Sequence, residues 1–490
     1  MSELTTTRWS SNSRDDQFDV HNSATGARIA TVQGGGAAEV DAAVIAADKA
    51  FRTDWRWRPA VERGMMLLEI ARKVREDIDA IAELETLENG KPLDQARMDV
   101  EACIAIFSFF GSLAGKIPGN LYDSGLILSS SIIEPYGVVG AIIPFNWPPV
   151  HTAGKIAPAL AAGNTIVIKP PEQTPLCVMR IVDIIQSVLP PDVVHIVPGV
   201  GKSAGAALAG HKLVRKISFT GATATGAAIV RTSAENTTPT LLELGGKNAV
   251  FVMADADLDE AAKAIVEGGF FNQGEACTAL SRVLVHASVK DRLVAKLAPA
   301  ISSLNVGSGM VSGTHVGPLV TKSQQEKVLE YIQIGVREGA KIAAQAKLPT
   351  DDDLQGGYFV PPTMLVDVAP SMRVAKEEIF GPVVCVIAFE TEDEAISIAN
   401  DTDYGLTCAI FTRDHPTALR ISRHMDVGMV FINNYYRRTF GVPFGGTKGS
   451  GYGREHAIET LKDYGRIKVI STPSGLGSFP YWSAVQDTGL

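Results

Sequence analysis

Apolar positions follow a helical period early in the chain and short strand-like runs later. From residue 37 to about residue 115, apolar residues recur at i, i+3, i+4 and i+7, which predicts helices. Asn89-Gly90 followed by Lys91-Pro92 predicts a break between two of them. A strand, a turn and a second strand are predicted over residues 20–35. An exposed strand is predicted over 126–133, where serines lie between apolar flanks.

Short β-branched runs alternate with helical segments between residues 137 and 252. Such runs are typical of strands buried on both faces, as in a parallel sheet. The alternation predicts a doubly wound nucleotide-binding architecture. The predicted strands are VVGAII (138–143), TIVIK (165–169), VVHIV (193–197), RKISF (215–219) and NAVFV (248–252).

A second α/β section is predicted from about residue 255 to residue 447. Its helices are expected over 257–271 and 323–340, and its strands over 383–389, 407–412 and 428–433. A further strand is predicted over 467–473, and a tail rich in glycine, proline and serine begins at Ser474.

Charge and cysteine content exclude several classes of protein. A net charge of −9 without a basic cluster is unsuited to nucleic-acid binding. The uncharged stretch 135–154 is broken by prolines, so a membrane span is not expected, and the N-terminus lacks the apolar core of a secretory signal. The five cysteines include no CxxC pair, which argues against a disulfide framework or a zinc site and favours a reducing compartment. We therefore expect a cytoplasmic protein.

The first chemical candidate is Cys277, in the segment FFNQGEACTA (270–279). Cysteine is the most intrinsically nucleophilic side chain near neutral pH, and small neighbours leave room for a carbonyl to approach. A single cysteine in a chain of 490 residues is, however, more often a small buried apolar residue. The other motifs of the chain must decide between these interpretations.

Two turns that follow predicted strands are suited to a nucleotide. Gly221 and Gly226 lie where the strand 215–219 gives way to a helix, and helix N-terminal amides favour a pyrophosphate. Their spacing is not GxGxxG, so a tight turn is an equal alternative. Lys169 and Glu172 follow the strand 165–169 and could hydrogen-bond ribose hydroxyls, or could be solvated charges in a proline turn.

Three more positions could serve catalysis or cofactor binding. Asn146, among prolines and aromatic residues, could donate to an oxyanion, or could satisfy its own backbone. Glu243, beside two glycines, could be a general base, or a buried carboxylate with a structural partner. Glu378 and Phe380 could hold a ribose and a flat ring, or could mark a helix end.

Seven motifs follow one another in a set order: PFNWP (144–148), KPPEQTP (169–175), FTGATATG (219–226), ELGGKNAV (243–250), NQGEAC (272–277), EEIFGPV (377–383) and PFGGTKGSGYGRE (443–455). In this order and at these separations they resemble the NAD(P)-dependent aldehyde dehydrogenase superfamily. The resemblance covers residues 18–473, nearly the whole chain.

The resemblance implies a Rossmann-like cofactor domain, an α/β catalytic domain and a small β oligomerisation arm. The NAD-binding domain is expected over 1–116 and 136–246, the catalytic domain over 247–450, and the arm with the C-terminal tail over 117–135 and 460–490. Exposed strand edges in the arm imply a homodimer or homotetramer. The tail is expected to pack on another surface, such as that of a neighbouring subunit, because it carries three aromatic residues: Phe479, Tyr481 and Trp482.

For catalysis, the resemblance makes Cys277 the nucleophile that forms a thiohemiacetal and then a thioester. The Asn146 amide and the Cys277 backbone N–H would hold the oxyanion. Glu243, which lies 34 positions before the cysteine, would be the base for the thiol or for the hydrolytic water, and Lys155 would support this network.

For the cofactor, the resemblance implies contacts from strand ends and turns. Pro171 stands where many NADP-using relatives carry serine, and Glu172 would face a 2′-phosphate, so NAD is expected rather than NADP. Alanine replaces the usual serine at position 222, which leaves the backbone donors to the phosphates. The cofactor-binding residues are expected to be Ile143, Trp147, Lys169, Glu172, Gly221, Ala222, Gly226, Leu244, Glu378 and Phe380.

For the aldehyde, the resemblance implies a tunnel, with a wide mouth because Gly154 replaces a large aromatic residue. Trp147 and Phe271 favour an aromatic or medium apolar aldehyde. The alternative is a semialdehyde acid, paired with Arg437 or Arg438, although these two arginines could instead simply point to solvent. The substrate-lining residues are expected to be Trp147, His151, Gly154, Phe271, Ala276, Thr278, Arg438 and Phe440.

Three other functions stay open on sequence alone. A coenzyme A-acylating dehydrogenase is disfavoured because such relatives typically lack the residue at Glu243. A non-catalytic scaffold is disfavoured because Cys277, Glu243, Asn146 and Glu378 are all retained. A metal-dependent enzyme is disfavoured because no His, Cys or carboxylate cluster has ligand spacing.

Overall fold

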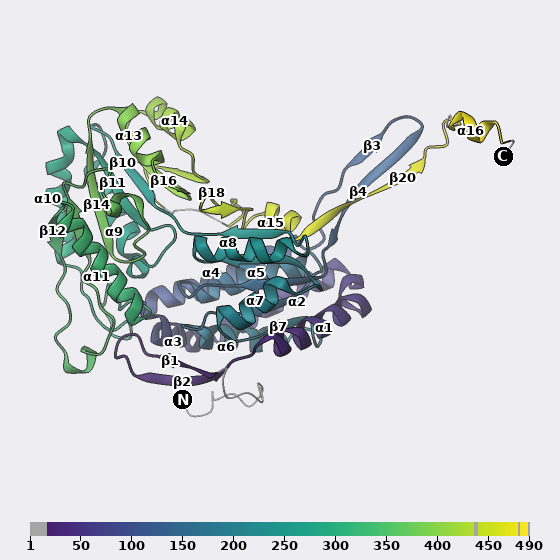
Figure 1. The fold of residues 1–490 in the computed structure, drawn as a ribbon, viewed down its shortest axis with the longest axis horizontal. Coiled ribbons are helices and arrows are strands. Elements are labelled where there is room, and N and C mark those ends of the chain that lie inside the picture. The colour runs from purple at the N-terminus through teal and green to yellow at the C-terminus, as the bar shows by residue number, and fades with distance from the viewer. Residues whose placement is uncertain (1–16, 436–439, 479–480, 489–490) are drawn as a thin grey trace.

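A computed structural model of the chain describes residues 17–435, 440–478 and 481–488. Figure 1 shows two sheet-containing bodies side by side and a narrow arm that extends away from them. The arm carries the C-terminal end of the chain, far from both bodies. The fold is thus α/β, as expected from the alternation of strands and helices.

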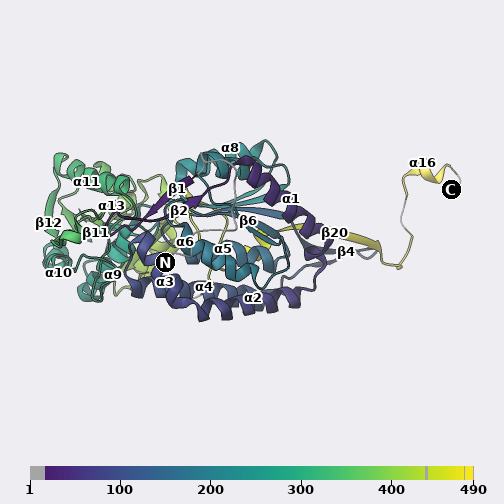
Figure 2. The same cartoon turned by 90° about the horizontal axis from the view of Figure 1, so that it is seen from below.

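The first sheet has six strands, and helices cover both of its faces. Alternate residues of one central strand enter different cores: Val139 and Ala141 face α2–α6, whereas Val138 and Ile142 face α1, α7 and α8. Figure 2 shows these two helical layers on opposite sides of the sheet. In order, the strands are β19 (Gly451–Tyr452), β9 (Thr240–Glu243), β8 (Val214–Thr220), β5 (Val138–Ile142), β6 (Thr165–Lys169) and β7 (Val194–Ile196). The helices are α1 (Ala37–Thr53), α2 (Ala60–Glu76), α3 (Ile78–Asn89), α4 (Leu93–Leu113), α5 (Pro148–Ala161), α6 (Pro175–Gln186), α7 (Ala206–Gly210) and α8 (Thr223–Ala234).

The second sheet has seven strands and is also covered on both faces, by α9 and α10 on one side and by α11, α13 and α14 on the other. In order, the strands are β12 (Lys341–Gln345), β13 (Thr363–Val366), β14 (Val383–Phe389), β11 (Leu280–His286), β10 (Asn248–Val252), β16 (Thr407–Phe411) and β17 (Met429–Ile432). The helices are α9 (Leu258–Phe270), α10 (Lys290–Ser302), α11 (Lys322–Arg337), α12 (Arg373–Lys376), α13 (Glu392–Asn400) and α14 (His415–His424).

One strand expected in the first sheet lies in the second. The run NAVFV forms β10, which pairs with β11 and β16, so its grouping with the strands of residues 138–219 was wrong. The chain crosses between the sheets through Gly245 and Gly246. The crossing needs a residue without a side chain, because a Cβ on Gly246 would lie 2.3 Å from the carbonyl oxygen of Cys277.

The arm is a three-stranded antiparallel sheet of β20 (Gly465–Pro473), β4 (Ile127–Pro135) and β3 (Leu121–Asp123). β20 pairs with β4 along its whole length, from Gly465 opposite Pro135 to Pro473 opposite Ile127. Ile467, Val469 and Ile470 of β20 are more than half exposed. The arm therefore offers an apolar edge to solvent.

Smaller elements connect these parts. They are the hairpin β1 (Gln17–His21) with β2 (Arg28–Gln33), the pair β15 (Tyr404–Gly405) with β18 (Thr447–Lys448), and the helices α15 (Ile458–Asp463) and α16 (Ser483–Gln486). The first helical stretch breaks at Asn89-Gly90 as predicted, but also near Asp54 and Asp77. In the part of the chain that the structure describes, no helix has the length and apolar character needed to cross a membrane.

Candidate active site

A cleft of about 450 Å³ opens at the carboxyl ends of the first sheet's strands. The chain runs from β5 to β6 and β7 on one side and then returns to β8 on the other side of β5, so the strand order reverses there. Ligands of open α/β sheets bind at this kind of switch point. The cleft is lined by segments that follow β5, β6, β8 and β9, and by Cys277, Gln324, Lys327, Glu378 and Phe380 from the second body.

Cys277 stands after a tight turn in which Asn272, Gln273 and Gly274 all have positive φ, at 52°, 55° and 69°. Left-handed backbone costs a non-glycine residue on the order of 1–3 kcal/mol, so surrounding contacts must hold it. The Asn272 Nδ2 donates to the carbonyls of Asn146 and Glu275, at 3.0 Å each, and its backbone N–H donates to Gln95 Oε1. At Gly274 a Cβ would lie 2.4 Å from the Gly381 carbonyl oxygen. The turn thus places the thiol in the cleft.

The thiol of Cys277 is half-buried beside carboxylates. Burial, followed by the negative charges of Glu243 and Glu378, raises the pKa of this thiol above its ordinary value. A thiol in that state is mostly protonated at neutral pH, and the thiolate is the nucleophilic form. A nucleophilic role therefore requires a nearby base.

Glu243, the carboxylate whose charge acts most strongly on Cys277, is the candidate for that base. It is the last residue of β9, 2% exposed, and β19 pairs it with Gly451. Gly445 lies against it without a side chain, since a Cβ there would be 2.7 Å from the Glu243 Oε1. The carboxylate is thus enclosed by the chain segment 445–455 and lies close enough to Cys277 to act on its charge.

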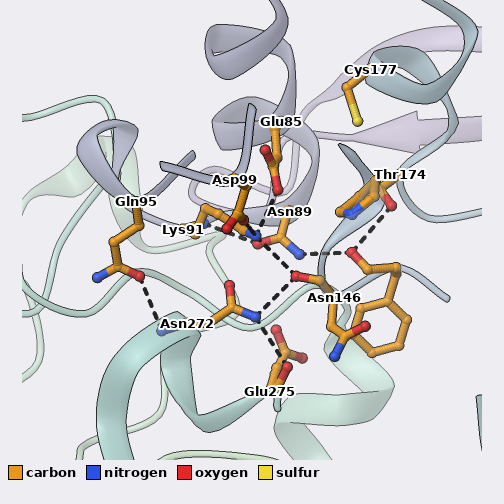
Figure 3. A network of polar contacts seen from close by, with 12 residues as sticks. Glu85, Asn89, Lys91, Gln95, Asp99, Asn146, Thr174, Cys177, Asn272 and Glu275 are labelled. Carbon is orange, nitrogen blue, oxygen red and sulfur yellow. Dashed lines mark hydrogen bonds and ion pairs between the residues drawn. The ribbon is translucent and has the colours of Figure 1, made fainter. Parts of the chain in front are cut away.

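The backbone around Asn146 is fixed from three directions. Lys91 Nζ and Asn272 Nδ2 donate to the Asn146 carbonyl at 2.9 Å and 3.0 Å, and Asn89 Nδ2 donates to the Phe145 carbonyl at 3.0 Å. Figure 3 shows these donors converging on the two carbonyls. Asn146 itself lines the cleft, as Cys277 does. The asparagine is therefore a preorganised group and not a free turn residue.

Lys91 belongs to a buried cluster that sequence reasoning missed. It ion-pairs with Glu85 at 2.6 Å and with Asp99, and both Lys91 and Glu85 are fully buried. Burial raises the pKa of Glu85 and that of Asp99, while the lysine opposes this rise. The motif Asn89-Gly90-Lys91 indicated only a helix break, because sequence spacing does not show what a lysine faces.

Lys155 pairs with a partner that was not expected from sequence. Its ammonium group forms a fully buried ion pair with Glu455, at the end of the last motif. His456 next to it fills the space at Gly154, where a Cβ would lie 3.5 Å from the His456 Cε1. The expected wide mouth at Gly154 is therefore wrong, because this imidazole occupies the volume that a larger side chain would take.

The end of the cleft that is expected to hold the adenosine contains the expected polar groups, Lys169 and Glu172. Lys169 Nζ lies 3.0 Å from Glu172 Oε1, which also accepts from the Gly201 N–H at 2.6 Å. Gly221 and Ala222 line the cleft where α8 begins, and no side chain caps the helix there. Gly226 does not line it; a Cβ there would lie 2.8 Å from a methyl carbon of Leu244. Gly226 permits close packing of α8, while Leu244 and Ile143 line the cleft.

Glu378 and Phe380 close the other end of the cleft. Glu378 Oε1 accepts from the Gly246 N–H at 2.8 Å, and burial raises the pKa of this carboxyl group. Phe380 has a φ of 60°, a left-handed conformation, and its carbonyl accepts from Gln324 Nε2 at 2.7 Å. Its ring meets Phe145 edge-on at 5.8 Å. The strained backbone thus presents an aromatic ring to the cleft.

An apolar cavity of about 330 Å³ lies on the other side of the Cys277 loop. Ala276 and Thr278 line it, while Cys277 between them lines the cleft. Trp147, expected at both sites, lines this cavity only; His151 and Gly154 do not line it. Arg437 and Arg438 lie outside the described residues. The lining residues are Met98, Asp99, Ala102, Trp147, Val150, Ala264, Glu267, Gly268, Phe271, Ala276, Thr278, Tyr435 and Phe440.

The chain was compared with known proteins. The model of the family described as "Aldehyde dehydrogenase family" matches residues 9–470. The chain belongs to the aldehyde dehydrogenase family. It is therefore an oxidoreductase that acts on aldehydes, as the motif order indicated, and its α/β fold is that of the family.

Several known proteins are similar to this chain over nearly its whole length. An aldehyde dehydrogenase of Didymella fabae is 51% identical over 480 residues, which cover 98% of this chain and 97% of the relative. The structure of betaine aldehyde dehydrogenase (betB) from Staphylococcus aureus in complex with NAD+ has a TM-score of 0.93 at 37% identity, covering 97% and 95% of the two chains. PnpE in complex with nicotinamide adenine dinucleotide has a TM-score of 0.92 at 40% identity, covering 95% and 96%.

Within this aldehyde dehydrogenase the described residues contain no group of three or more His, Cys, Asp or Glu side chains that could hold a metal ion. The five cysteines are unpaired. The cleft is lined by the Cys277 thiol, the Glu172 and Glu378 carboxylates and the Asn146 amide, among other residues.

Proposed function

We propose that the protein oxidises an aldehyde to the carboxylic acid with NAD through a covalent adduct on Cys277. The position of the Cys277 loop is the observation that carries this proposal. The thiol lies in a cleft with nucleotide-suited ends, and its two neighbours line an apolar cavity. An aldehyde that enters through the cavity would meet the thiol at the boundary between the two spaces.

The proposed chemistry begins with attack of the Cys277 sulfur on the aldehyde carbon. Glu243 takes the thiol proton, which is needed because the thiol pKa is raised. The Asn146 amide and the Cys277 backbone N–H hydrogen-bond to the oxyanion. Glu378 and Phe380 would hold the nicotinamide of NAD, which would supply the acceptor for the hydride that leaves the thiohemiacetal. Glu243 passes the first proton to solvent and then takes a proton from a water that attacks the Cys277 thioester. This releases the acid, and a proton returned to the sulfur regenerates the thiol.

The residues that line the cleft fit NAD. The uncapped start of α8 offers backbone N–H groups to a pyrophosphate. Lys169 and Glu172 would hold the adenosine ribose, and Glu378 with Phe380 would hold the nicotinamide ribose and ring. Gly221, Ala222, Leu244 and Ile143 complete the contacts.

We propose a preference for NAD over NADP. The Glu172 carboxylate is held at the cleft by Lys169 and by the Gly201 N–H. A 2′-phosphate on the ribose would bring negative charge next to this carboxylate, which is unfavourable in a partly buried site. Relatives crystallised with NAD+ support NAD as a cofactor, while the preference over NADP rests on Glu172.

The apolar cavity favours an aromatic or medium apolar aldehyde. Trp147, Phe271, Phe440 and Val150 are among the apolar residues of its wall, and its described residues include two carboxylates but no lysine or arginine. A carboxylate-bearing semialdehyde would face like charge from Asp99 and Glu267. The second candidate substrate is a semialdehyde whose carboxylate would pair with Arg437 or Arg438.

We also propose a homodimer or homotetramer that assembles through the arm. The apolar edge of β20 supports this, since an exposed strand edge is a template for pairing. The division into domains at 1–116 with 136–246, 247–450, and 117–135 with 460–490 stays part of the proposal, as does a cytoplasmic location. In the tail, Tyr481 and Trp482 are exposed, whereas Phe479 lies outside the described residues.

The proposal is tested by NADH formation with aromatic, aliphatic and acid-terminated aldehydes, for wild type, Cys277→Ala and Glu243→Gln. We expect turnover with NAD in wild type, none in Cys277→Ala, and a loss of about 10²-fold or more in Glu243→Gln. Wild-type turnover that requires coenzyme A would indicate acyl transfer. A wild type inactive with every aldehyde, with and without coenzyme A and with either cofactor, would establish a scaffold.

A further inference from the structure

An amide that serves an oxyanion has two chemically opposite ends. The Nδ2 end of an asparagine donates two hydrogen bonds, whereas the Oδ1 end only accepts. Only the Nδ2 end stabilises a negative oxygen, and a reversed amide would repel it. The orientation of the Asn146 amide is therefore a separate requirement from its position.

The contacts to the Asn146 backbone do not meet this requirement. Lys91 and Asn272 both donate to its main-chain carbonyl, so they fix where the residue stands. Rotation about the last side-chain bond exchanges Oδ1 and Nδ2 without disturbing either bond. A contact to the side chain itself is needed to distinguish the two ends.

His151 makes that contact. It lies in the first turn of α5, five residues after Asn146, and its Nε2 is 3.3 Å from the Asn146 Oδ1. Both side chains are buried, at 8% and 3% exposure. Within the described residues the Asn146 Nδ2 has no hydrogen-bond partner, and Asn146 lines the cleft beside Cys277. The pairing thus uses the accepting end and leaves the donating end for a ligand.

We propose that His151 is a positioning residue that orients the Asn146 amide, with Nε2–H donating to Oδ1, so that Nδ2 faces the aldehyde oxygen. The inference rests on the proposed function of Asn146 as an oxyanion donor. It assigns His151 to the asparagine, not to the wall of the aldehyde cavity where sequence reasoning placed it.

The surroundings of His151 keep the ring neutral. Burial, followed by the positive charges of Lys155 and Lys91, holds the pKa of this imidazole well below its ordinary value. A neutral imidazole donates from one nitrogen only, so the proton must be on Nε2 for the bond to Oδ1. With the proton on Nδ1, Nε2 would accept from Nδ2 and select the reversed amide.

The test compares four variants: His151→Leu, His151→Gln, Asn146→Ala and the double variant His151→Leu/Asn146→Ala. Leucine fills the space and removes the donor, whereas glutamine offers an N–H in its place. The measurements are kcat/KM for an aromatic aldehyde with saturating NAD, and the rate of Cys277 alkylation by iodoacetamide without aldehyde. Alkylation needs the folded site and the thiol but no oxyanion donor.

We expect His151→Leu to lower kcat/KM about three- to tenfold, the worth of one neutral hydrogen bond. His151→Gln should recover part of this loss. Asn146→Ala should lose about 10²-fold, and the double variant should equal Asn146→Ala within about twofold, since no amide is left to orient. The alkylation rate should be the same in all of them.

The inference is overturned if His151→Leu is as active as wild type, or if its loss persists undiminished in the double variant. Loss of alkylation in His151→Leu would show that the histidine maintains the fold of the site; His151→Met, with an unbranched side chain, then repeats the same comparison. If Asn146→Ala is fully active, the proposed oxyanion role fails instead, and this outcome is distinct from the failure of His151 alone.

Discussion

Replacing the buried Lys91 with methionine should destabilise the protein strongly. The Lys91 side chain is fully buried, and its ammonium lies 2.6 Å from Glu85, pairs with Asp99 and donates to the Asn146 carbonyl. Removing one partner of a buried ion pair costs about 3–5 kcal/mol, because the remaining charge is left uncompensated. Here one cation serves two carboxylates. Protonation of either carboxylate relieves part of the cost, so about 3 kcal/mol is expected at pH 7.

The expected loss depends on pH in a definite direction. Burial raises the pKa of both Glu85 and Asp99 in the folded state, so these groups take up protons as the pH falls. A neutral carboxyl group needs no cation. The destabilisation by Lys91→Met should therefore be larger at pH 8 than at pH 5.5.

Urea denaturation followed by tryptophan fluorescence measures this effect. Trp55 is fully buried in the helical layer that contains α4, so its emission reports on this core. A loss of about 3 kcal/mol moves the midpoint by about 1 M if the urea dependence is about 3 kcal/mol per M. The matched control is the neutral triple variant Glu85→Gln/Lys91→Met/Asp99→Asn, which should recover at least half of the loss. The reasoning is refuted if Lys91→Met is as stable as wild type, or if the triple variant is no better than Lys91→Met.

Three further predictions concern the cofactor, the substrate and the thiol. Glu172→Gln should reduce the preference for NAD over NADP in kcat/KM by about tenfold, since one like charge is removed; Glu235→Gln, at the far end of α8, is the control and should not change the preference. Trp147→Ala should raise KM for an aromatic aldehyde about tenfold through lost apolar contact, and an unchanged KM would remove Trp147 from the substrate wall. Iodoacetamide alkylation of Cys277 should still accelerate above pH 8, because burial and carboxylates raise the thiol pKa, and a plateau below pH 8 would contradict the raised pKa.

Sequence patterns were most informative where local chemistry decides the structure. The runs at 138–143 and 165–169 became β5 and β6 to within one residue, because apolar strands covered on both faces have a strong local signature. Motifs at strand ends, including Asn146 and Lys169, line one cleft because parallel strands end at the same edge of a sheet.

Long-range pairing is what the sequence did not reveal. Lys91 faces Glu85 and Asp99 in a site that local spacing describes only as a helix break. The glycine at position 154 shows from sequence alone that no large side chain is present there. The sequence does not show that His456, from a segment about 300 residues later, occupies the space. The strand 248–252 has the composition of its predecessors, yet it joins the other sheet because the chain crosses at Gly245-Gly246.

The segment that contains β19 and Glu455 also determines when a newly synthesised molecule can form the proposed site. β9, which ends with Glu243, pairs on its outer edge with β19, and Lys155 forms its buried ion pair with Glu455. During synthesis, β19 is made more than 200 residues after β9, and Glu455 is made 300 residues after Lys155. A nascent chain therefore carries Cys277, Asn146 and the proposed cofactor turns long before Glu243, the proposed base, is enclosed. We expect the proposed site to be complete only once residue 455 has been made, so chains that end earlier lack β19 and Glu455.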